Sequence, residues 1–202
     1  MATPRIAPVP QNGQAAQAQP TPHPAAPAAA PNRRPPAEIN VRPEVVAQMI
    51  GGEGGWVAVP YNDQAGNCTS GAGHLRHNGP CSPDERRMHL SADEMHRDLR
   101  ADLRDAEDGV RRNVRRPLTQ GEYDALVSLT FNAGAGGARP VFHEINRNGP
   151  DAAAQVILTT AIHVAVRDPH NPHRVIGHTI SHGLQNRRHR ELAVYQGREP
   201  GQ

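Results

Sequence analysis

The chain has 202 residues, of which 22 are basic and 20 acidic, so its formal net charge is only +2. This length suggests one domain with an appendage, and so small a charge does not choose between an anionic wall polymer and nucleic acid as a partner. No apolar run approaches the roughly 18 residues of a membrane span, and two cysteines are too few for a disulfide scaffold.

Residues 1–41 differ in composition from the rest of the chain. They hold half of the 20 prolines, many alanines and almost no large apolar side chains. Such a segment cannot bury enough surface to offset the entropy lost on ordering, so we predict a disordered tail over 1–41 and a folded domain over 42–202. The segment also lacks the apolar run of a secretory signal. We therefore expect synthesis in the cytoplasm, with delivery to any extracytoplasmic target by another factor.

The first elements expected in the domain are a short helix and a small β lobe. Pro43 opens the run PEVVAQMI and glycines follow it on both sides of Glu53, a pattern typical of a short helix with proline at its first position. Residues 56–75 are rich in Gly, Asn and β-branched side chains, which predicts a sheet or hairpin.

Helices are expected in the rest of the chain. Ser91 and Glu94 form a capping box that begins a helix reaching about Val114, and Thr119 with Glu122 form a second capping box. Three further helices are expected, at about 138–147, 150–166 and 180–196, with a loop between the last two. We therefore predict an α+β, mainly helical fold in which a small β lobe and a helical bundle lobe flank a cleft.

A set of polar residues follows the first expected helix. Glu53 is followed by Asp63, by Thr69 and then by the run 71–74, Gly-Ala-Gly-His. Cleavage of a glycosidic bond needs one acid to protonate the leaving oxygen and a second carboxylate on the other face. A glutamate beside Trp56 would be kept protonated by desolvation, whereas an aspartate in a polar turn would stay ionised. Taken alone, the pattern is weak and favours solvated surface carboxylates, and a Gly-x-Gly-His run is equally common as a plain turn.

Three ordered blocks of the sequence carry a more specific signal. They read EGG-x5-YND-x5-TSGAGHL, LTQGEYDALVSLTFNAG and GLQNRRHRELAVY. Together they resemble the phage-type lysozymes, the endolysins or muramidases of glycoside hydrolase family 24, over about residues 43–196. The resemblance implies a lysozyme-like fold and hydrolysis of the β-1,4 bond between N-acetylmuramic acid and N-acetylglucosamine in bacterial peptidoglycan, which degrades the wall and lyses the cell.

The resemblance also implies roles for individual residues. It makes Glu53 the general acid, Asp63 the second carboxylate and Thr69 the holder of the attacking water. The other expected site residues contact the sugar or support those that do. They are Asn132, Gly71 and Gly73 as substrate contacts, and His74, Asp102 and Arg187 as supporting residues.

Charged pairs are expected on two helix faces that would otherwise be apolar. Asp102 falls inside the apolar stripe of its helix, and the resemblance gives His74 as its partner. This pair should raise the pKa of the histidine and depress that of the aspartate. The resemblance implies that Arg187 pairs with the catalytic glutamate. Arg188 and Glu191 are expected to form a structural ion pair, because buried charges are costly unless paired.

The two cysteines and the region before the closing helix each leave a question open. Cys68 and Cys81 bracket the turn that carries Thr69, so we expect a disulfide in an oxidising compartment, with two buried thiols as the alternative. The family commonly has a tryptophan in its penultimate helix, where this chain reads TTAIHVAV, followed by a longer loop rich in histidine. The outer substrate subsites are therefore where this chain should differ from the family.

Other functions compete with this interpretation. Among the 12 histidines, the pairs His170/His173 and His178/His182 have spacings that suit a zinc amidase, but no cysteine lies near them and no HExxH motif is present. We therefore expect no metal and no cofactor. An inactive wall-binding or virion protein of the same fold is disfavoured because all three expected catalytic residues are present.

A lytic transglycosylase, in which the muramyl 6-hydroxyl replaces water, is disfavoured because Asp63 and Thr69 suit hydrolysis. The expected partner is peptidoglycan, bound by a monomer with no membrane span and no role for nucleic acid. An endolysin, a virion-borne lysin and a secreted effector all fit the sequence.

Overall fold

The computed structural model describes residues 31–52 and 54–199 and shows an α+β, mainly helical architecture, as the sequence predicts. The helices are α1 (Pro43–Gly52), α2 (Ala92–Asn113), α3 (Gln120–Asn148), α4 (Ala154–Thr159) and α5 (His182–Tyr195), with short 3-10 helices η1 (Pro36–Glu38), η2 (Glu85–Arg87) and η3 (Pro150–Ala153). The strands are β1 (Val57–Asn62), β2 (Cys68–Gly71), β3 (His74–His77), β4 (His163–Asp168) and β5 (Asn171–Ile180).

Both predicted capping boxes are confirmed. The hydroxyl of Ser91 accepts the Glu94 N–H at 3.2 Å, and the Glu94 carboxylate accepts the Ser91 N–H at 2.8 Å. Thr119 and Glu122 repeat the arrangement at the start of α3, with distances of 3.2 and 2.8 Å. Each box satisfies backbone donors that the first helical turn leaves unpaired, which is why α2 and α3 begin where the sequence indicates.

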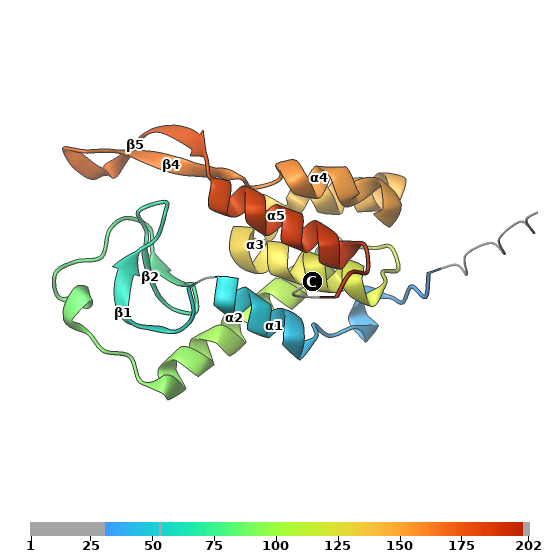
Figure 1. Cartoon of the computed structure of the whole chain (residues 1–202), viewed down its shortest axis with the longest axis horizontal. Coiled ribbons are helices and arrows are strands. Elements are labelled where there is room, and N and C mark those ends of the chain that lie inside the picture. The colour runs from blue at the N-terminus through green and yellow to red at the C-terminus, as the bar shows by residue number, and fades with distance from the viewer. Residues whose placement is uncertain (1–30, 53, 200–202) are drawn as a thin grey trace, which may run out of the picture. The chain divides into compact units, whose positions relative to one another are not determined.

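Helix α3 forms the centre of the bundle and contacts α1, α2, α4 and α5 (Figure 1). Several of its large apolar side chains are fully buried, among them Leu126, Leu129 and Ile145. The hydrogen-bonded helix runs through a kink at Gly134, whose φ of 68° and ψ of 165° are not helical. Two helical segments therefore meet at Gly134 within α3, as the sequence predicts on either side of the Phe-Asn-Ala-Gly turn.

The β lobe follows α1 and is an antiparallel sheet of order β1-β2-β3. Tyr61 of β1 and Leu75 of β3 both pair with Thr69 of β2, so Thr69 occupies the central strand. The lobe packs on α2, which contacts both β2 and β3. The predicted small β lobe is confirmed.

Part of the predicted helix 150–166 is wrong. Helix α4 ends at Thr159, and residues from His163 onward form strand β4, which pairs with β5 in an antiparallel hairpin. The hairpin also replaces the loop expected after residue 166. Both strands contain β-branched residues, among them Val164, Val166 and Val175, which pack well on a pleated surface. Accordingly α5 begins only at His182, after the Ser181 hydroxyl accepts the Leu184 N–H.

The described part of the predicted tail, residues 31–41, is packed on the domain rather than disordered. Ile39 is 1% exposed in the main core. Arg33 binds the buried Glu122 with an N–O distance of 2.7 Å, and Arg34 exchanges two backbone hydrogen bonds with Leu118. Composition misled the prediction because one isoleucine and the long-range ion pair anchor a segment that has little other apolar surface. Residues 1–30 lie outside the described residues.

We expect Ile39→Ala to cost roughly 2 to 5 kcal/mol of unfolding free energy, because it leaves a cavity in the core. Chemical denaturation of the purified domain measures this cost. Ile176→Ala is the matched control, since Ile176 is 54% exposed on β5 and should change stability by no more than about 0.5 kcal/mol.

Truncations test the same segment. Removing residues 2–30 should leave the melting temperature nearly unchanged, whereas removing residues 2–41 should lower it clearly. Equal melting temperatures for the two truncated proteins would show that residues 31–41 add nothing to the stability of the domain.

Candidate active site

A cleft of about 1310 Å³ lies between the β lobe and the helices. It is larger than a pocket for a small molecule, so its size suits a polymer. Most of the residues expected at the site line it: Asp63, Thr69, Gly73, Asp102, Asn132 and Arg187. Glu53 lies outside the described residues, but its neighbour Gly54 also lines the cleft.

Asp63 stands at the start of a tight turn between β1 and β2, which we call the Asp63 turn (residues 63–67). One carboxylate oxygen, Oδ1, accepts the N–H groups of Ala65 and Asn67, both at 2.8 Å. The Asp63 N–H in turn donates to the Asn67 carbonyl at 2.9 Å. These bonds fix the carboxylate relative to the backbone while the side chain still lines the cleft.

Thr69 and the two glycines that follow it do not behave alike. Thr69 is only 4% exposed, yet it lines the cleft from the central strand. Gly73 has a φ of 88° and also lines the cleft, so it can bring backbone close to a ligand. Gly71 instead packs against α2, where an added Cβ would lie 3.6 Å from the Met95 side chain. We therefore assign Gly71 to packing between the lobe and the helix, not to sugar contact.

Trp56, expected to lie beside the glutamate, is partly exposed at the start of the β lobe. Its side chain is 40% exposed and rests against His96 of α2, with ring centroids 4.5 Å apart. The aromatic contact thus connects the start of the β lobe to α2.

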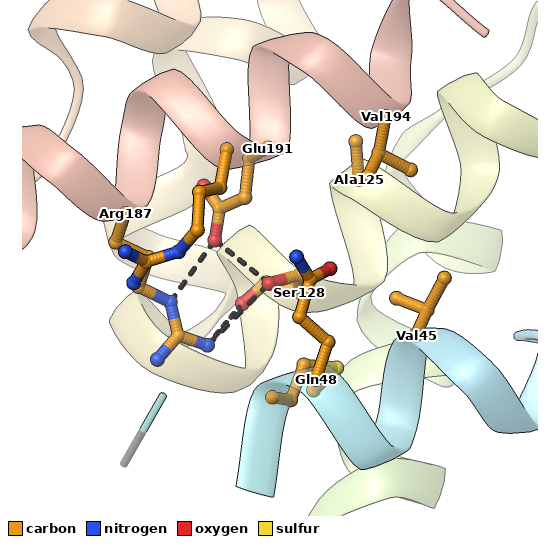
Figure 2. A pocket seen from close by; sticks show the side chains of 9 residues that line it. Val45, Gln48, Ala125, Ser128, Arg187, Glu191 and Val194 are labelled. Carbon is orange, nitrogen blue, oxygen red and sulfur yellow. Dashed lines mark hydrogen bonds and ion pairs between the residues drawn. The ribbon is translucent and has the colours of Figure 1, made fainter. Parts of the chain in front are cut away.

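Arg187 of α5 lies between the cleft and a small pocket, and lines both (Figure 2). Its Nε donates to Glu191 Oε1 at 3.0 Å, and the same oxygen accepts the Ser128 hydroxyl at 2.8 Å. The pocket measures about 20 Å³, which is room for one water molecule. Contacts with Glu191 of its own helix and with Ser128 of α3 therefore fix the direction in which the Arg187 guanidinium points.

Arg188 of α5 makes a contact with Asn132 that the sequence did not predict. It is fully buried, forms an ion pair with Glu191 at 3.1 Å, and donates a hydrogen bond to the side-chain oxygen of Asn132. The expected Arg188–Glu191 pair is thus present in the structure. The link to Asn132 was missed because the two residues are 56 positions apart and no local pattern joins them. This hydrogen bond orients the Asn132 amide at the kink of α3.

His74 and Asp102 form the expected pair, with His74 Nδ1 2.9 Å from the carboxylate. The pair joins β3 to α2 and so fixes the β lobe on the bundle. The expected direction of the aspartate shift is wrong, however. Burial raises the pKa of Asp102 above its ordinary value of 3.8, and this effect exceeds the opposing hydrogen bond from His74.

The raised pKa of Asp102 determines how the unfolding free energy of the protein changes with pH. A carboxyl group that binds its proton more tightly when folded stabilises the fold fully below its unfolded pKa, near 3.8, and loses that contribution as the pH rises through the folded value. Asp102→Asn should therefore cost most below that pH and progressively less above it. Denaturation of both proteins from pH 3 to 7 measures the trend. A cost that grows with pH would show that the ion pair with His74 dominates.

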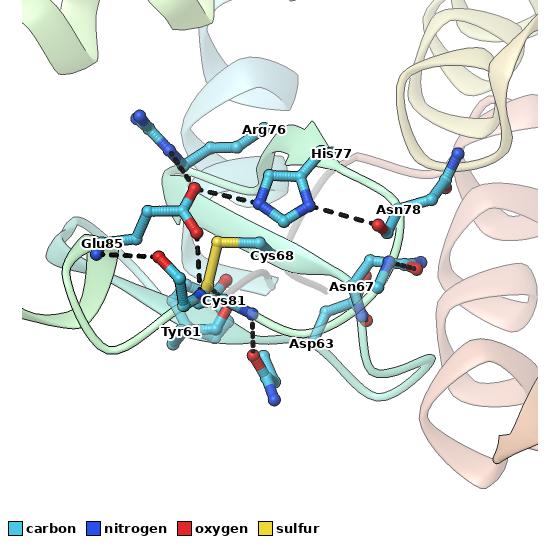
Figure 3. Close-up of a disulfide and its surroundings, with 12 residues drawn as sticks. Tyr61, Asp63, Asn67, Cys68, Arg76, His77, Asn78, Cys81 and Glu85 are labelled. Carbon is cyan, nitrogen blue, oxygen red and sulfur yellow. Dashed lines mark hydrogen bonds and ion pairs between the residues drawn. A yellow bond between two sulfur atoms is a disulfide. The ribbon is translucent and has the colours of Figure 1, made fainter. Parts of the chain in front are cut away.

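Cys68 and Cys81 form a disulfide that joins β2 to the loop after β3 (Figure 3). Hydrogen bonds from Ser82 hold the pKa of nearby Glu85 low, at about 2, and the carboxylate also accepts a hydrogen bond from His77 at 2.9 Å. Donor atoms of Cys68, His77 and Glu85 lie within 4.8 Å of one another. This arrangement does not make a metal centre, because the sulfur of Cys68 is already bonded to Cys81.

The disulfide closes a loop with a sequence separation of 13 residues. Closing a loop of this length is worth about 3 kcal/mol in the chain-entropy account. We expect a thiol reductant to lower the denaturant midpoint of the wild-type protein, while Cys81→Ser should be less stable and insensitive to reductant. Two alkylatable thiols in air-oxidised wild-type protein, measured by mass spectrometry, would contradict the disulfide.

Comparison with known proteins adds to this geometry. The phage lysozyme family model matches residues 52–191. The SAR-endolysin of Haemophilus phage HP1 is 29% identical over 160 residues, which cover 78% of this chain and 81% of the relative. The endolysin of Salmonella phage P22 is 36% identical over 103 residues, 48% of this chain and 68% of the relative. The solved structure of an endolysin from Escherichia coli O157:H7 phage FAHEc1 has a TM-score of 0.61 at 25% identity, covering 78% of this chain and 94% of that one.

A β lobe and a helical bundle that enclose a polymer-sized cleft with carboxylates define a lysozyme-like glycosidase. The chain belongs to the phage lysozyme family. It is a muramidase that degrades bacterial peptidoglycan, and the predicted fold and activity are confirmed. Within the described residues no helix is both long and apolar enough to span a bilayer.

Proposed function

We propose that Glu53 donates the proton to the leaving oxygen in an inverting hydrolysis of the N-acetylmuramic acid to N-acetylglucosamine bond. The observation that carries the proposal is that Asp63, Thr69 and Asn132, which come from separate elements, line one cleft together with Gly54, the residue after Glu53. An acid and a second carboxylate on opposite faces of a sugar are what this reaction requires.

The other residues take the following roles in the proposal. Asp63 and the Thr69 hydroxyl hold the water that attacks the anomeric carbon from the face opposite the leaving group. Asn132, oriented by Arg188, contacts the sugar. Arg187 orients Glu53. An arginine favours the charged carboxylate, so its value to an acid catalyst lies in direction rather than in protonation.

Glu53→Gln keeps the shape of the side chain but removes the transferable proton. We expect it to fold normally and to lose at least about 100-fold in rate on purified peptidoglycan, the lower end for general acid catalysis. Glu44→Gln is the matched control, because Glu44 is exposed in the first turn of α1. A fully active Glu53→Gln protein would falsify the assignment of the acid.

Asp63→Ala should be similarly impaired, with Asp84→Ala, an exposed aspartate of the same lobe, as its control. Asp63→Cys should keep part of the activity, since related enzymes are expected to use cysteine there. The products test the chemistry. An α-anomeric reducing end supports inversion, a β-anomer refutes it, and a 1,6-anhydro end would make the protein a lytic transglycosylase.

We further propose that the protein acts as a monomer on the peptidoglycan layer, after delivery by another factor. The residues to which the proposal gives roles, Asp63, Thr69, Asn132 and Arg187, line the cleft together within a single copy of the chain. Size-exclusion chromatography with light scattering of the active protein tests this.

A further inference from the structure

The β4–β5 hairpin extends on the same side of the bundle as the β lobe (Figure 1), and a side chain of the hairpin contacts the Asp63 turn. Arg167 on β4 makes the contact: its Nε donates to the Ala65 carbonyl at 2.6 Å, and its Nη2 donates to Asn67 Oδ1 at 2.6 Å. The remaining terminal nitrogen donates to the Pro172 carbonyl of β5 at 3.1 Å. One guanidinium thus connects both strands of the hairpin with a turn about a hundred residues earlier in the chain.

The turn is shaped to receive this side chain. Gly66 has a φ of 72°, and a Cβ placed on it would lie 2.6 Å from Arg167 Nε, so any larger residue would displace the guanidinium. Gly79, on the next loop of the lobe, likewise leaves room for the His173 ring, which a Cβ would approach to 2.9 Å. Two glycines at the contact allow the hairpin to approach the lobe this closely.

A second hydrogen bond connects the Asp63 turn with Ser181, the residue that follows the end of β5. The Ser181 hydroxyl, which caps α5, donates to Gln64 Oε1 at 2.7 Å. The turn is therefore held from β4 and from the start of α5 together. Both partners, Gln64 and Ala65, are cleft-lining residues, so the contact lies on the rim of the cleft.

Arg167 and Asp63 bind different atoms of the same two turn residues, Ala65 and Asn67. Asp63 Oδ1 accepts the N–H groups of Ala65 and Asn67, whereas Arg167 binds the carbonyl of Ala65 and the side chain of Asn67. Any shift of the turn therefore moves the carboxylate with it. Displacements of about 1 Å at a reacting group can cost about 100-fold in rate.

We propose that Arg167 is a positioning residue that fixes the Asp63 carboxylate by clamping the Asp63 turn across the rim of the cleft. The inference rests on the proposed function of Asp63. It also gives a role to the hairpin, which stands where the sequence departs from its family.

Arg167→Ala tests the clamp, with Arg174→Ala as the matched control. Arg174 lies on the same hairpin, and its side chain is 70% exposed. Its ion pair with Asp168 is weak, with a long N–O distance of 3.7 Å. On soluble peptidoglycan fragments, Arg167→Ala should lose about 10-fold in kcat with little change in KM, while Arg174→Ala matches the wild type. Arg167→Lys, which keeps one donor to the turn, should fall between them.

Two further measurements separate positioning from general stability. Hydrogen exchange at the Ala65 and Asn67 amides should accelerate in Arg167→Ala, because these amides donate to the Asp63 carboxylate. In an Asp63→Ala background, Arg167→Ala should cause no additional loss of activity, as expected for residues that act as one unit.

Unchanged kcat in Arg167→Ala, or an equal loss with and without Asp63, would overturn the inference. Failure of the proposed function would look different: Asp63→Ala alone would remain fully active, while the exchange at Ala65 and Asn67 would still report whether Arg167 holds the turn.

Discussion

Two guanidinium groups and one carboxylate are buried between α3 and α5, and much of the site depends on this arrangement. Arg187 and Arg188 share Glu191, and the Oε1 atom of Glu191 also accepts the Ser128 hydroxyl. Charges removed from water are tolerated only with good geometry and further hydrogen bonds. The cluster therefore fixes how α5 lies on α3, and only a small range of packings can satisfy it.

That constraint propagates into the cleft. Because Arg188 binds Asn132, the kink of α3 at Gly134 is tied to the charge cluster, and the Asn132 amide is oriented at the wall of the cleft. On the opposite wall, the His74–Asp102 pair fixes the β lobe on α2. Each wall of the cleft is thus held by a partly or fully buried polar contact, which is directional where apolar packing is not.

Local signals predicted the parts of this structure that depend on local chemistry. The capping boxes at Ser91 and Thr119 needed only residues three positions apart, and the β lobe followed from its turn residues. The hairpin was missed because a short apolar run such as Ile162–Val166 fits a strand or a buried helix equally well by periodicity. Pairing with the residues near Val175 and Thr179 makes this run a strand. The periodicity of a single segment contains no information about that pairing.

For the site, too, some features could be predicted from the sequence, whereas others depend on tertiary contacts. The resemblance of three ordered blocks to the phage lysozymes implied that Asp63, Thr69 and Asn132 share one cleft, and all three line it. The raised pKa of Asp102 and the packing of Gly71 against Met95 depend on how much of α2 covers the lobe, which is a tertiary quantity. Arg167 could not be connected with Ala65, 102 positions away, from any sequence pattern.

The attachment of residues 31–42 has a consequence for the order in which the protein can be built. Arg42 leaves the ribosome early, but its partner Asp124 follows 82 residues later, and Arg33 waits for Glu122 across 89 residues. Domains are synthesised from the N-terminus, and contacts between distant segments form only once both exist. The segment 31–42 is thus unable to dock fully until α3 has emerged, so the nascent chain carries Ile39 uncovered for most of the synthesis of the β lobe and α2.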